Sequence, residues 1–592
     1  MTVEKLITDH IDIWSSTLQT RSTAGRGSNG KIDLYGIKKL RELILELAVR
    51  GKLVPQDPND EPASELLKRI AAEKAELVKQ GKIKKQKSLP EISEDEKPFE
   101  LPEGWGWTRL SDISAYIQRG KGPKYAEHGS VKVVSQKCVQ WSGFKLEQSR
   151  WITDESIHSY TEERFLIDGD VLWNSTGAGG TAGRVIYLPV VKEKLVVDSH
   201  ITLIRTVRDN GQFISNYIST YGIQQRFDPK HSNTLLSGTT NQAELNTSVV
   251  TSFLVPFPPQ KEQERINDKA AELMSLCDQL EQQSLISLDA HQQLVETLLA
   301  TLTDSQNAEE LTENWARISQ HFDTLFTTEA SIDTLKQTIL QLAVMGKLVP
   351  QDPNDEPASE LLKRIEQEKE QLAKEGKIKK QKPLPPVSDE EKSFELPKGW
   401  EWVRLGDIGT ISGGGTPSKN NEKYWSGDIP WVSPKDMKID YISTAELNIS
   451  ELAVTNSSVR IIPNNSILFV VRGMILAHTF PVAINQREVT INQDMKSISS
   501  RLFNMDFLLY LMKGMSHQIL GLVDRSSHGT CKLVSEKLFG LQIPLPPLSE
   551  QGRINSRIAE LMLLCDTLKS RLQSAQQTQL HLADALTDAA LN

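Results

Sequence analysis

The sequence predicts an α+β protein with a duplicated architecture, in which two α/β domains are joined by long repeated helices. Two observations carry this prediction. A segment at 51–70 recurs unchanged at 346–365, and a second motif near 258–267 recurs near 546–555. The stretches between these repeats, about 103–258 and 398–546, share little identity. Because 592 residues are too many for one hydrophobic core, we expect two similar frames that hold two different inserts.

The repeats divide the chain into five regions. We expect an N-terminal helical frame at 1–102, a first inserted domain at 103–258, a central repeated region with a long helix at 259–397, a second inserted domain at 398–546 and a C-terminal long helix at 547–592. A solenoid is excluded, because its period is only 20–50 residues. A duplication with one idle half is disfavoured, because both inserts have the composition of folded domains.

Each frame predicts two helices separated by a break. In the first frame, Leu40, Ile44 and Leu47 lie three and four residues apart, as on one face of a helix. The prolines between 55 and 62 interrupt the chain, and a second helix is expected from about 63 to 80. Gly81 is placed to end that helix. The second frame repeats this pattern.

A Pro-Pro-x-x-Glu-Gln motif opens each of the two long helices. Proline suits a helix start because the first N–H groups of a helix lack partners. Apolar residues then follow the a and d spacing of a coiled coil, at Ile266, Ala270, Leu273, Cys277 and Leu280, and at Ile554, Ile558, Leu561, Cys565, Leu568, Leu572 and Ala575. We expect the two helices to pack on each other along these seams; packing of each on its own domain is the alternative.

Composition and charge exclude several classes of protein. The net charge is −9, but the two inserts carry +1 and +2, so the remainder carries −12. Domains that touch DNA through a limited patch fit this division, whereas a uniformly basic DNA-coating protein does not. The four cysteines form no CxxC pair, so neither a zinc site nor a disulfide framework is indicated. With no apolar stretch long enough for a membrane and no signal peptide, we expect a cytoplasmic protein.

Two glycine-rich segments imitate nucleotide-binding motifs. The first, Gly25 to Lys31, resembles a P-loop, but Ile32 stands where a magnesium-binding Ser or Thr is needed. The second, Gly177 to Ala182, precedes a strand-like run rather than a helix, so no helix N-terminus awaits a pyrophosphate. We interpret it as a strand–loop–strand tip with N–H groups for a phosphate or base edge, or as an ordinary hairpin. The sequence shows no methyltransferase, helicase, nuclease or hydrolase motif set.

The arrangement resembles the specificity subunits of type I restriction-modification enzymes. The resemblance spans nearly the whole chain. It rests on the doubled frames, the openings LPEGWGW at 101–107 and LPKGWEW at 396–402, the segment GGGTPS at 413–418 and the Pro-Pro-x-x-Glu-Gln exits. The first insert departs from the pattern, because Gly120-Lys-Gly-Pro-Lys124 replaces the Gly-Gly-Thr-Pro-Ser opening.

This resemblance implies a non-catalytic subunit with two target-recognition domains that each read one half of a split, asymmetric double-stranded DNA site. Two methyltransferase subunits would methylate adenine with S-adenosylmethionine, and two translocase-nuclease subunits would use ATP and magnesium for restriction. The repeated helices would form an antiparallel coiled coil, which acts as a spacer and sets the gap between the two half-sites. Roughly 20 helical residues span about 30 Å, close to the 34–36 Å between successive major-groove contacts on one DNA face.

Arginine and lysine suit guanine, asparagine and glutamine suit adenine, and serine and threonine are versatile. Polar residues near expected loops and strand ends are therefore the candidate DNA contacts. In the first domain they are Lys121, Lys124, Gln136, Lys137, Asn174, Thr239, Asn241 and Gln242. In the second they are Thr416, Ser418, Lys419, Ser433, Lys435, Arg472, Gln493, Thr530 and Lys532. No catalytic or metal-ligating residue is predicted.

Three alternatives stay open at this point. The chain could serve a complex that only methylates, it could be a coiled-coil scaffold that binds no DNA, or it could be an enzyme built on the glycine loops. Duplex binding separates the first from the second, and nucleotide binding by the isolated chain marks the third.

Overall fold

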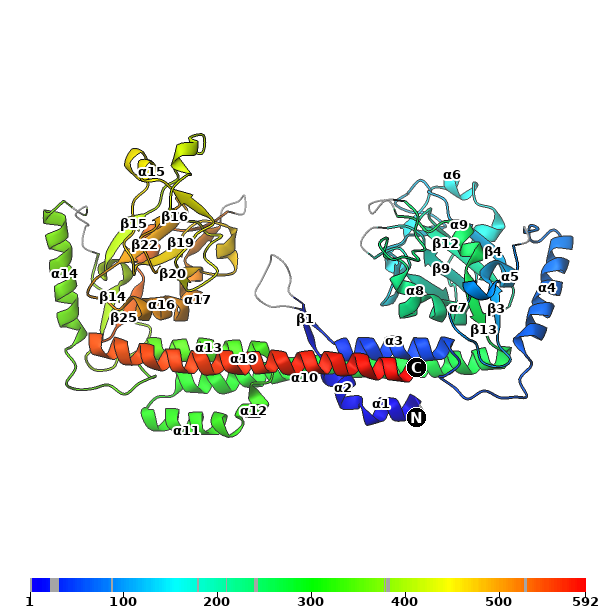
Figure 1. Cartoon of the computed structure of the whole chain (residues 1–592), viewed down its shortest axis with the longest axis horizontal. Coiled ribbons are helices and arrows are strands. Elements are labelled where there is room, and N and C mark those ends of the chain that lie inside the picture. Colours follow the sequence, from blue (N-terminus) through cyan, green and yellow to red (C-terminus); the bar gives the residue numbers. More distant parts are fainter. Residues whose placement is uncertain are drawn as a thin grey trace. The chain divides into compact units, whose positions relative to one another are not determined.

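The computed structural model describes residues 3–21, 31–86, 89–177, 180–208, 210–238, 243–376, 378, 384–525 and 530–591. The chain forms two compact units, and each unit contains one inserted domain (Figure 1). Unit 1 consists of residues 1–19, 32–285 and 576–592, and unit 2 of residues 20–31 and 286–575. Both long helices therefore begin in one unit and end in the other.

The helical part of unit 1 is organised around α3 (Tyr35–Val49), which follows α1 (Val3–Asp9), α2 (Ile11–Ser16) and the short strands β1 (Gln19–Arg21) and β2 (Lys31–Asp33). One face of α3 is buried, and its polar side chains reach both long helices. Arg41 pairs with Asp278 at 2.7 Å near the start of α10 (Gln260–Asp304). The hydroxyl of Tyr35 donates to Asp584 at 2.7 Å near the end of α19 (Leu548–Leu591). The second frame helix, α4 (Ala63–Lys79), starts after Pro62.

Unit 2 repeats this helical arrangement around α13 (Glu329–Val344). Its apolar side chains share one core with the last part of α10 and the first part of α19, including Val295, Ile339 and Cys565. Lys569 of α19 pairs with Asp333 of α13 at 3.0 Å. Two further helices, α11 (Ala308–Gln320) and α12 (Phe322–Leu325), connect α10 to α13, and α14 (Ala358–Lys374) corresponds to α4. The two long helices thus exchange ends between two similar three-helix arrangements.

The first inserted domain is built on a four-stranded antiparallel sheet of order β10-β9-β12-β4. Its strands are β10 (Val185–Leu188), β9 (Asp170–Asn174), β12 (Ile201–Thr206) and β4 (Ser114–Arg119). The helix α7 (Gly211–Ile218) packs on β9 and β10 and is followed by α8 (Tyr221–Gln225). A smaller sheet has the order β11-β5-β8, with β11 (Leu195–Val197), β5 (Lys132–Val134) and β8 (Arg150–Trp151). The remaining elements are α5 (Leu110–Ile113), α6 (Asp154–Ile157), α9 (Thr247–Ser252), β6 (Val139–Gln140), β7 (Gly143–Phe144) and short 3-10 turns.

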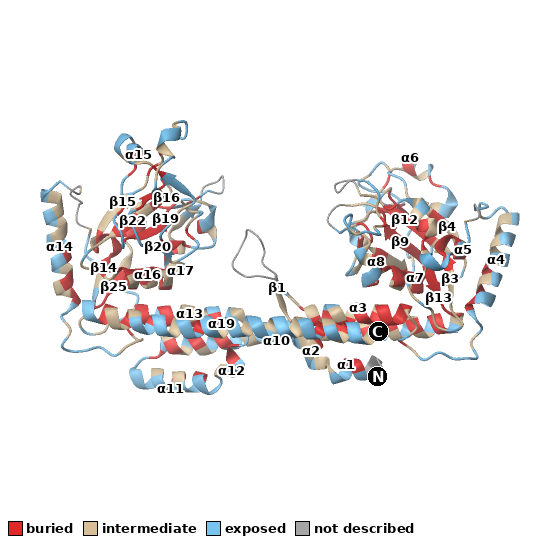
Figure 2. Ribbon diagram, viewed as in Figure 1, coloured by how far each residue is buried: buried red, intermediate tan, exposed pale blue. Residues whose placement is uncertain are grey.

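The second inserted domain has the same plan with one more strand. Its main sheet has the order β15-β22-β19-β20-β17, formed by β15 (Thr410–Gly413), β22 (Met495–Ser499), β19 (Ile467–Val470), β20 (Val482–Asn485) and β17 (Tyr441–Ile442). The smaller sheet is β18-β16-β21, formed by β18 (Leu447–Ile449), β16 (Ile429–Val432) and β21 (Thr490–Ile491). Four helices, α15 (Glu451–Asn456), α16 (Met505–Gly514), α17 (Ser516–Gly521) and α18 (Ser535–Phe539), and a hairpin of β23 (Val523–Arg525) and β24 (Cys531–Leu533) complete it. The strands β19 and β20 are buried throughout (Figure 2).

Each insert is closed at its base by a pair of strands, one from each end of the insert. In the first domain β3 (Gly106–Arg109) pairs antiparallel with β13 (Leu254–Phe257). In the second, β14 (Glu401–Arg404) pairs antiparallel with β25 (Gln542–Leu545). The chain therefore leaves each insert where it entered it, and each insert is a self-contained addition to its frame.

The repeated residues meet at this base, which we call the junction. In unit 2 it consists of Trp400, Glu550, Gln551, Arg553 and Asp355. The Trp400 indole N–H donates to the buried Glu550 carboxylate at 3.0 Å, and the Gln551 amide donates to Pro546 O at 3.1 Å. Arg553 pairs with Asp355 at 2.6 Å.

The junction of unit 1 has the same contacts, with Trp105 bonded to Glu262 at 3.0 Å and Arg265 paired with Asp60 at 2.7 Å. These contacts explain why the two sequence repeats have different offsets. The frame and the helix opening are separated by inserts of different length, but they come together in space.

The predicted fold class is confirmed, as are the frame helices and the strand–helix character of both inserts. Most residues of the predicted helix seams are buried, including Ile266, Cys277, Ile558 and Cys565. Ile554 and Ile558 pack in the core of the second insert and its frame, Cys565 packs in the core that contains α13, and Ala575 is exposed. An antiparallel coiled coil of the two long helices stays a prediction. Within the described residues, no helix is long and apolar enough to cross a membrane.

The junction generates a prediction about stability. Burial raises the pKa of Glu550, so the native protein keeps this proton to a higher pH than the unfolded chain. The free energy of unfolding should therefore fall as the pH rises above the ordinary glutamate range. Glu550→Gln keeps an acceptor for Trp400 and should remove this dependence without a loss of stability. Glu550→Ala leaves the buried N–H without an acceptor and should cost about 1–3 kcal/mol.

Calorimetric unfolding across pH 4–8 measures both effects. Glu262→Ala and Glu262→Gln are the matched changes in unit 1. Equal stability of the alanine and glutamine variants at either junction would contradict the role of the indole–carboxylate bond.

Candidate functional site

The two inserted domains share one edge whose backbone is the same although the sequences differ. In the first domain, Ser175 N donates to His200 O at 2.8 Å and Leu245 N donates to Ser175 O at 2.7 Å. In the second, Val471 N donates to Asp494 O at 2.8 Å and Leu533 N donates to Val471 O at 2.8 Å. By these bonds, the matched pairs of positions are Ser175 with Val471, His200 with Asp494, and Leu245 with Leu533.

The residues beside these positions match as well. An isolated antiparallel bridge joins Thr176 to Glu244 in the first domain, and another joins Arg472 to Lys532 in the second. Each is followed by a glycine with positive φ, Gly177 at +127° and Gly473 at +139°. Side chains rarely adopt such φ values, so glycine is the residue that allows the turn at both positions.

Glycine also sits where the first strand of each sheet passes another segment closely. A Cβ atom at Gly120 would lie within 3.0 Å of the carbonyl oxygens of Val197 and Asp198, and one at Gly414 would lie as close to those of Ile491 and Asn492. Gly120 and Gly414 are therefore equivalent. The sequence Gly120-Lys-Gly-Pro-Lys124 thus occupies the place of the Gly-Gly-Thr-Pro-Ser opening, although its side chains differ.

We call these matched positions the shared edge. It consists of Arg119, Thr176, His200 and Glu244 in the first domain, and of Gly413, Arg472, Asp494 and Lys532 in the second.

The side chains of the shared edge differ between the domains while their backbones coincide. At one matched pair of positions, the Thr176 hydroxyl hydrogen-bonds to His200 Nδ1 at 2.6 Å, whereas Arg472 forms an ion pair with Asp494 at 3.6 Å. At the other pair of matched positions, Arg119 forms an ion pair with Glu244. The corresponding residues of the second domain are Gly413, which has no side chain, and the exposed Lys532. One backbone thus displays two different sets of donors and acceptors.

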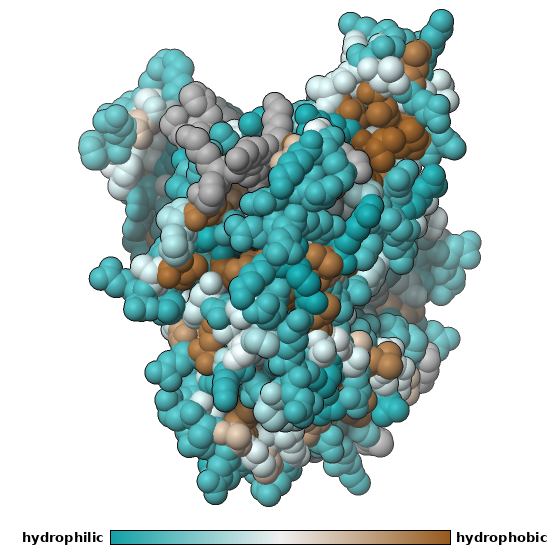
Figure 3. Space-filling view, turned by 90° about the vertical axis from the view of Figure 1, so that its left-hand side faces the viewer, coloured by the Kyte–Doolittle hydropathy of each residue, from teal (hydrophilic) through white to brown (hydrophobic). Residues whose placement is uncertain are grey.

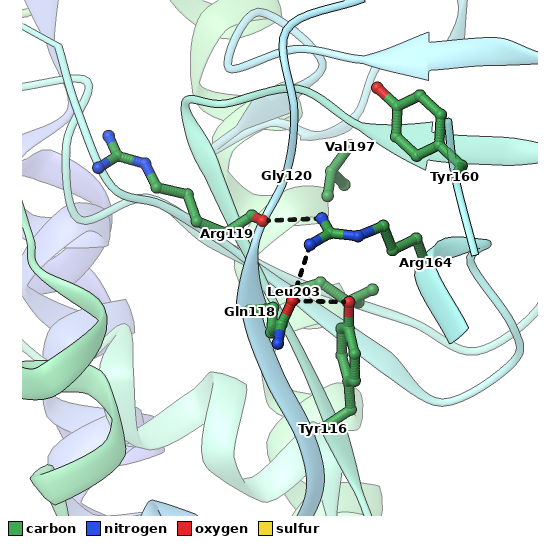
Figure 4. A pocket seen from close by; sticks show the side chains of 8 residues that line it. All are labelled: Tyr116, Gln118, Arg119, Gly120, Tyr160, Arg164, Val197 and Leu203. Atoms are coloured by element: carbon green, nitrogen blue, oxygen red, sulfur yellow. Dashed lines mark hydrogen bonds between the residues drawn. The ribbon is translucent and has the colours of Figure 1, made fainter. Parts of the chain in front are cut away.

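Arg164 holds the end of β4 in the first domain through hydrogen bonds (Figure 4). The Arg164 guanidinium donates to Arg119 O at 3.2 Å and to Gln118 Oε1 at 2.8 Å. Tyr160, whose pKa is raised to about 12 by burial, donates to Lys121 O at 3.0 Å. In Figure 4 the Arg119 side chain extends away from Arg164. The strand end is therefore held by its backbone, and the Arg119 side chain is directed elsewhere.

Several predicted contacts of the second domain come together at the shared edge. The Thr416 hydroxyl donates to Gln493 Oε1, and Gln493 precedes Asp494. Arg472 and Lys532 are bridged, and Thr530 precedes the same strand, β24. These five residues form one group.

The other four candidates of the second domain lie on turns outside this group. Ser418 and Lys419 are exposed. The Ser433 hydroxyl donates to Asp436 at 2.8 Å within its own turn, and Lys435 lies 3.9 Å from Glu446.

The candidates of the first domain are more scattered. Lys121 donates to Ser159 O at 2.9 Å, Lys124 pairs with Glu155 at 2.9 Å, and Lys137 is exposed. Gln136 is partly buried and its Oε1 atom would contact a Cβ at Gly177. Thr239, Asn241 and Gln242 lie outside the described residues, as do residues 178 and 179 of the glycine tip and most of the P-loop-like segment.

Asn174 has a different place from the one predicted. It is fully buried, and its amide nitrogen donates to Gln136 O and Thr181 O at 3.3 Å. A side chain enclosed in this way holds the loop after β9 in place and cannot reach a base edge, so we withdraw it as a contact. The residue type and its place at a strand end could be read from the sequence, but the direction of the Asn174 side chain could not.

Sequence reasoning missed Arg119, Thr176, His200 and Glu244 in the first domain and Asp494 in the second. Arg119 is far from Glu244 in the sequence, so local spacing contains no sign of their contact. The available signal was indirect: Gly120 follows β4 and Gly414 follows β15, the second strand of each insert, and aligning the two glycines would have placed Arg119 at the edge.

The shared edge offers cations, a hydroxyl and an imidazole on strand ends and turns, and its two carboxylates are each paired with an arginine. Such donors and acceptors are suited to phosphates and to base edges. Within the described residues, no group of three or more His, Cys, Asp or Glu side chains could hold a metal ion. The face of the molecule in Figure 3 is mainly hydrophilic, with a group of apolar side chains near its upper edge and smaller apolar groups across its middle and lower part. The geometry therefore favours recognition of a polar, anionic surface.

Comparison with known proteins agrees with this assignment. The family model described as "Type I restriction modification DNA specificity domain" matches twice, at residues 102–290 and 397–576. The chain belongs to this family and has the DNA sequence-specificity role of the specificity subunits of type I restriction enzymes.

Full-length relatives include the Type I restriction enzyme EcoEI specificity subunit and the Type I restriction enzyme EcoAI specificity subunit, both from Escherichia coli. Each is 50% identical to this chain, with 100% of both chains covered. A chain solved in a study of complex assembly and conformational transition of the type I R-M system has a TM-score of 0.50 and 17% identity, over 84% of this chain and 99% of that one. That structure supports the fold.

The close backbone approach predicts different effects for two adjacent glycines. Gly414→Ala should displace the shared edge of the second domain and cost about 1–3 kcal/mol, because its Cβ would collide with backbone oxygens. Gly413→Ala meets nothing within 4 Å and should change stability little. Thermal unfolding and DNA binding by the assembled complex measure this difference. Equal unfolding temperatures and equal DNA affinities of the two variants would show that the shared edge does not depend on the close backbone contact at Gly414.

Proposed function

We propose that this chain reads a two-part, asymmetric site in double-stranded DNA, one half-site with each inserted domain, and directs adenine methylation and restriction by partner subunits. The observation that carries the proposal is the shared edge. Two domains with the same edge backbone and different side chains are suited to two different half-sites, because base identity is read by the donor and acceptor pattern of side chains.

The proposed contacts are the group at the shared edge of the second domain, Thr416, Arg472, Gln493, Thr530 and Lys532, and its counterpart in the first domain, Arg119, Thr176, His200 and Lys121. The exposed lysines 124, 137, 419 and 435 and the serines 418 and 433 are proposed as contacts to the phosphate backbone. Phosphate contacts fix register without reading sequence, which suits side chains on peripheral turns.

The chemistry is assigned to the partners. Two methyltransferase subunits would supply S-adenosylmethionine, and two translocase-nuclease subunits would supply ATP and magnesium; this chain is proposed to hold no cofactor. The frames support docking of two equal partners, because the first two turns of α4 and α14 have the same sequence. Glu65 and Lys68 in the first frame correspond to Glu360 and Lys363 in the second, and about half or more of each side chain is accessible to solvent. Exposed residues are free to diverge unless something binds them.

The long helices are proposed to set the gap between the half-sites. Each begins beside one inserted domain, at the junction, and ends in the other unit. A helix rises 1.5 Å per residue, so a continuous helix fixes the separation of two sites better than a loop of the same length.

Mapping methylated adenines in the DNA of cells that contain this chain tests the proposal. We expect one methylated motif with two defined parts and a constant gap, which disappears when the gene for this chain is deleted. The purified chain alone should show no methyltransferase, ATPase or nuclease activity. A methylation map that does not change on deletion would contradict the proposal.

The same cells separate the two versions of the function. Unmethylated DNA that carries the motif should be restricted if nuclease subunits are present. Its survival with the methylation intact would favour a complex that only methylates.

A further inference from the structure

Each inserted domain contains one arginine at the shared edge that is paired with a carboxylate from a different strand or turn. In the first domain this is Arg119 at the end of β4, paired with Glu244. In the second it is Arg472 after β19, paired with Asp494. The two pairs occupy different positions of the edge, because Arg119 matches Gly413 and Arg472 matches Thr176.

Both arginines keep donors for a ligand. Within the described residues, Arg119 donates through Nε to Ser199 O at 2.5 Å and forms an ion pair through Nη1 with Glu244, which leaves both N–H groups of Nη2. In the same part of the chain, the Arg472 guanidinium is engaged only through the ion pair of its Nη1 with Asp494, and half of its side chain surface, 51%, is exposed. A guanidinium has five N–H donors in a rigid fork, so both arginines can bind a further pair of acceptors.

An arginine of purely structural function looks different in this fold. Arg205 binds the fully buried Asp170 through two bonds, at 2.7 and 2.8 Å, and also donates to the backbone carbonyls of Glu163 and Phe165. All three of its nitrogen atoms are engaged, and its partner has no exposed surface. Arg119 and Arg472 differ in both respects. Each has a guanidinium nitrogen that bonds to no described residue, and their carboxylate partners are 40% and 27% exposed.

We propose that Arg119 and Arg472 each read a guanine, one in each half-site, and that Glu244 and Asp494 are positioning residues that orient the two guanidinium groups. The inference rests on the proposed function and adds the base that each domain requires. Guanine presents two acceptors, O6 and N7, in the major groove, and a bidentate arginine is the side chain that matches them. A carboxylate that fixes the orientation of the guanidinium plane reduces the conformational entropy that the arginine side chain loses on binding.

The two arginines also read from different places on the same edge. Arg119 lies at the end of β4, an edge strand of the main sheet of its domain. Arg472 lies on the turn after β19, the central strand of the main sheet of its domain. The guanine should therefore occupy a different position within each half-site, which gives an asymmetric site from two domains of one fold.

The test uses the complete complex with its methyltransferase subunits and duplexes that carry the mapped motif. Each guanine of the motif is replaced in turn by 7-deazaguanine, which lacks the N7 acceptor and keeps Watson–Crick pairing. We expect one replacement in each half-site to weaken binding by about fivefold or more. Arg472→Ala should abolish the effect of the replacement in one half-site and leave the other unchanged, and Arg119→Ala should do the reverse. Each variant is thus the control for the other.

The carboxylates are tested in the same assay. Glu244→Gln and Asp494→Asn keep the side chain shape, so binding should persist while discrimination between guanine and 7-deazaguanine falls. Arg472→Lys keeps the charge but not the fork, so it should retain salt-dependent binding and lose the discrimination.

Unchanged sensitivity to 7-deazaguanine in both alanine variants would overturn the inference. So would an equal loss of affinity for the motif and for unrelated duplexes, because that result marks phosphate contacts. If the wild-type complex binds the two-part motif but no guanine replacement weakens it, the inference fails and the proposed function stands. If the complex does not bind the motif at all, the proposed function itself fails.

Discussion

The architecture depends on the junction at the base of each inserted domain. There the first and last strands of the insert pair, and the indole of Trp105 or Trp400 donates to a buried glutamate at the start of a long helix. An arginine on the same helix turn pairs with an aspartate of the frame loop. Because a buried N–H and a buried carboxylate are each costly without a partner, these residues must change together or not at all. This constraint accounts for the recurrence of these junction residues in both halves of the chain.

With the junction fixed, the rest of each insert is free to diverge. The strands keep their order and the edge keeps its backbone bonds, but the side chains at the edge do not correspond. Both domains have glycine where a Cβ would collide, as at Gly120 and Gly414, and where φ is positive, as at Gly177 and Gly473. The fold thus separates the residues that hold the domain together from those that are available for recognition.

The sequence was sufficient for the fold and only partly for the site. Helices and frames could be predicted because apolar spacing and capping residues are local, as for Leu40, Ile44 and Gly81. The long-helix seams were found for the same reason, but not their partners, since Cys565 packs in a core shared with α13 and the end of α10. Periodicity shows that a face is buried but not what covers it.

The site residues were harder because contacts across a sheet leave no local pattern. Thr416 and Gln493 were both chosen from their residue types, and they prove to be hydrogen-bonded to each other. Asn174 was chosen on the same grounds and is enclosed by backbone carbonyls. Arg119 was overlooked because its partner, Glu244, lies at the other end of the insert.

The central claim is that a constant junction carries two readers that act independently. The most direct measurement replaces residues 110–253, between the paired base strands β3 and β13, by the corresponding part of a relative with a different target. Trp105 and both junctions stay intact, and methylated adenines are mapped in cells that contain the hybrid chain. The account predicts a motif in which one half-site is new while the other half-site and the gap are unchanged. A change in both half-sites, or in the gap with both half-sites retained, would contradict it.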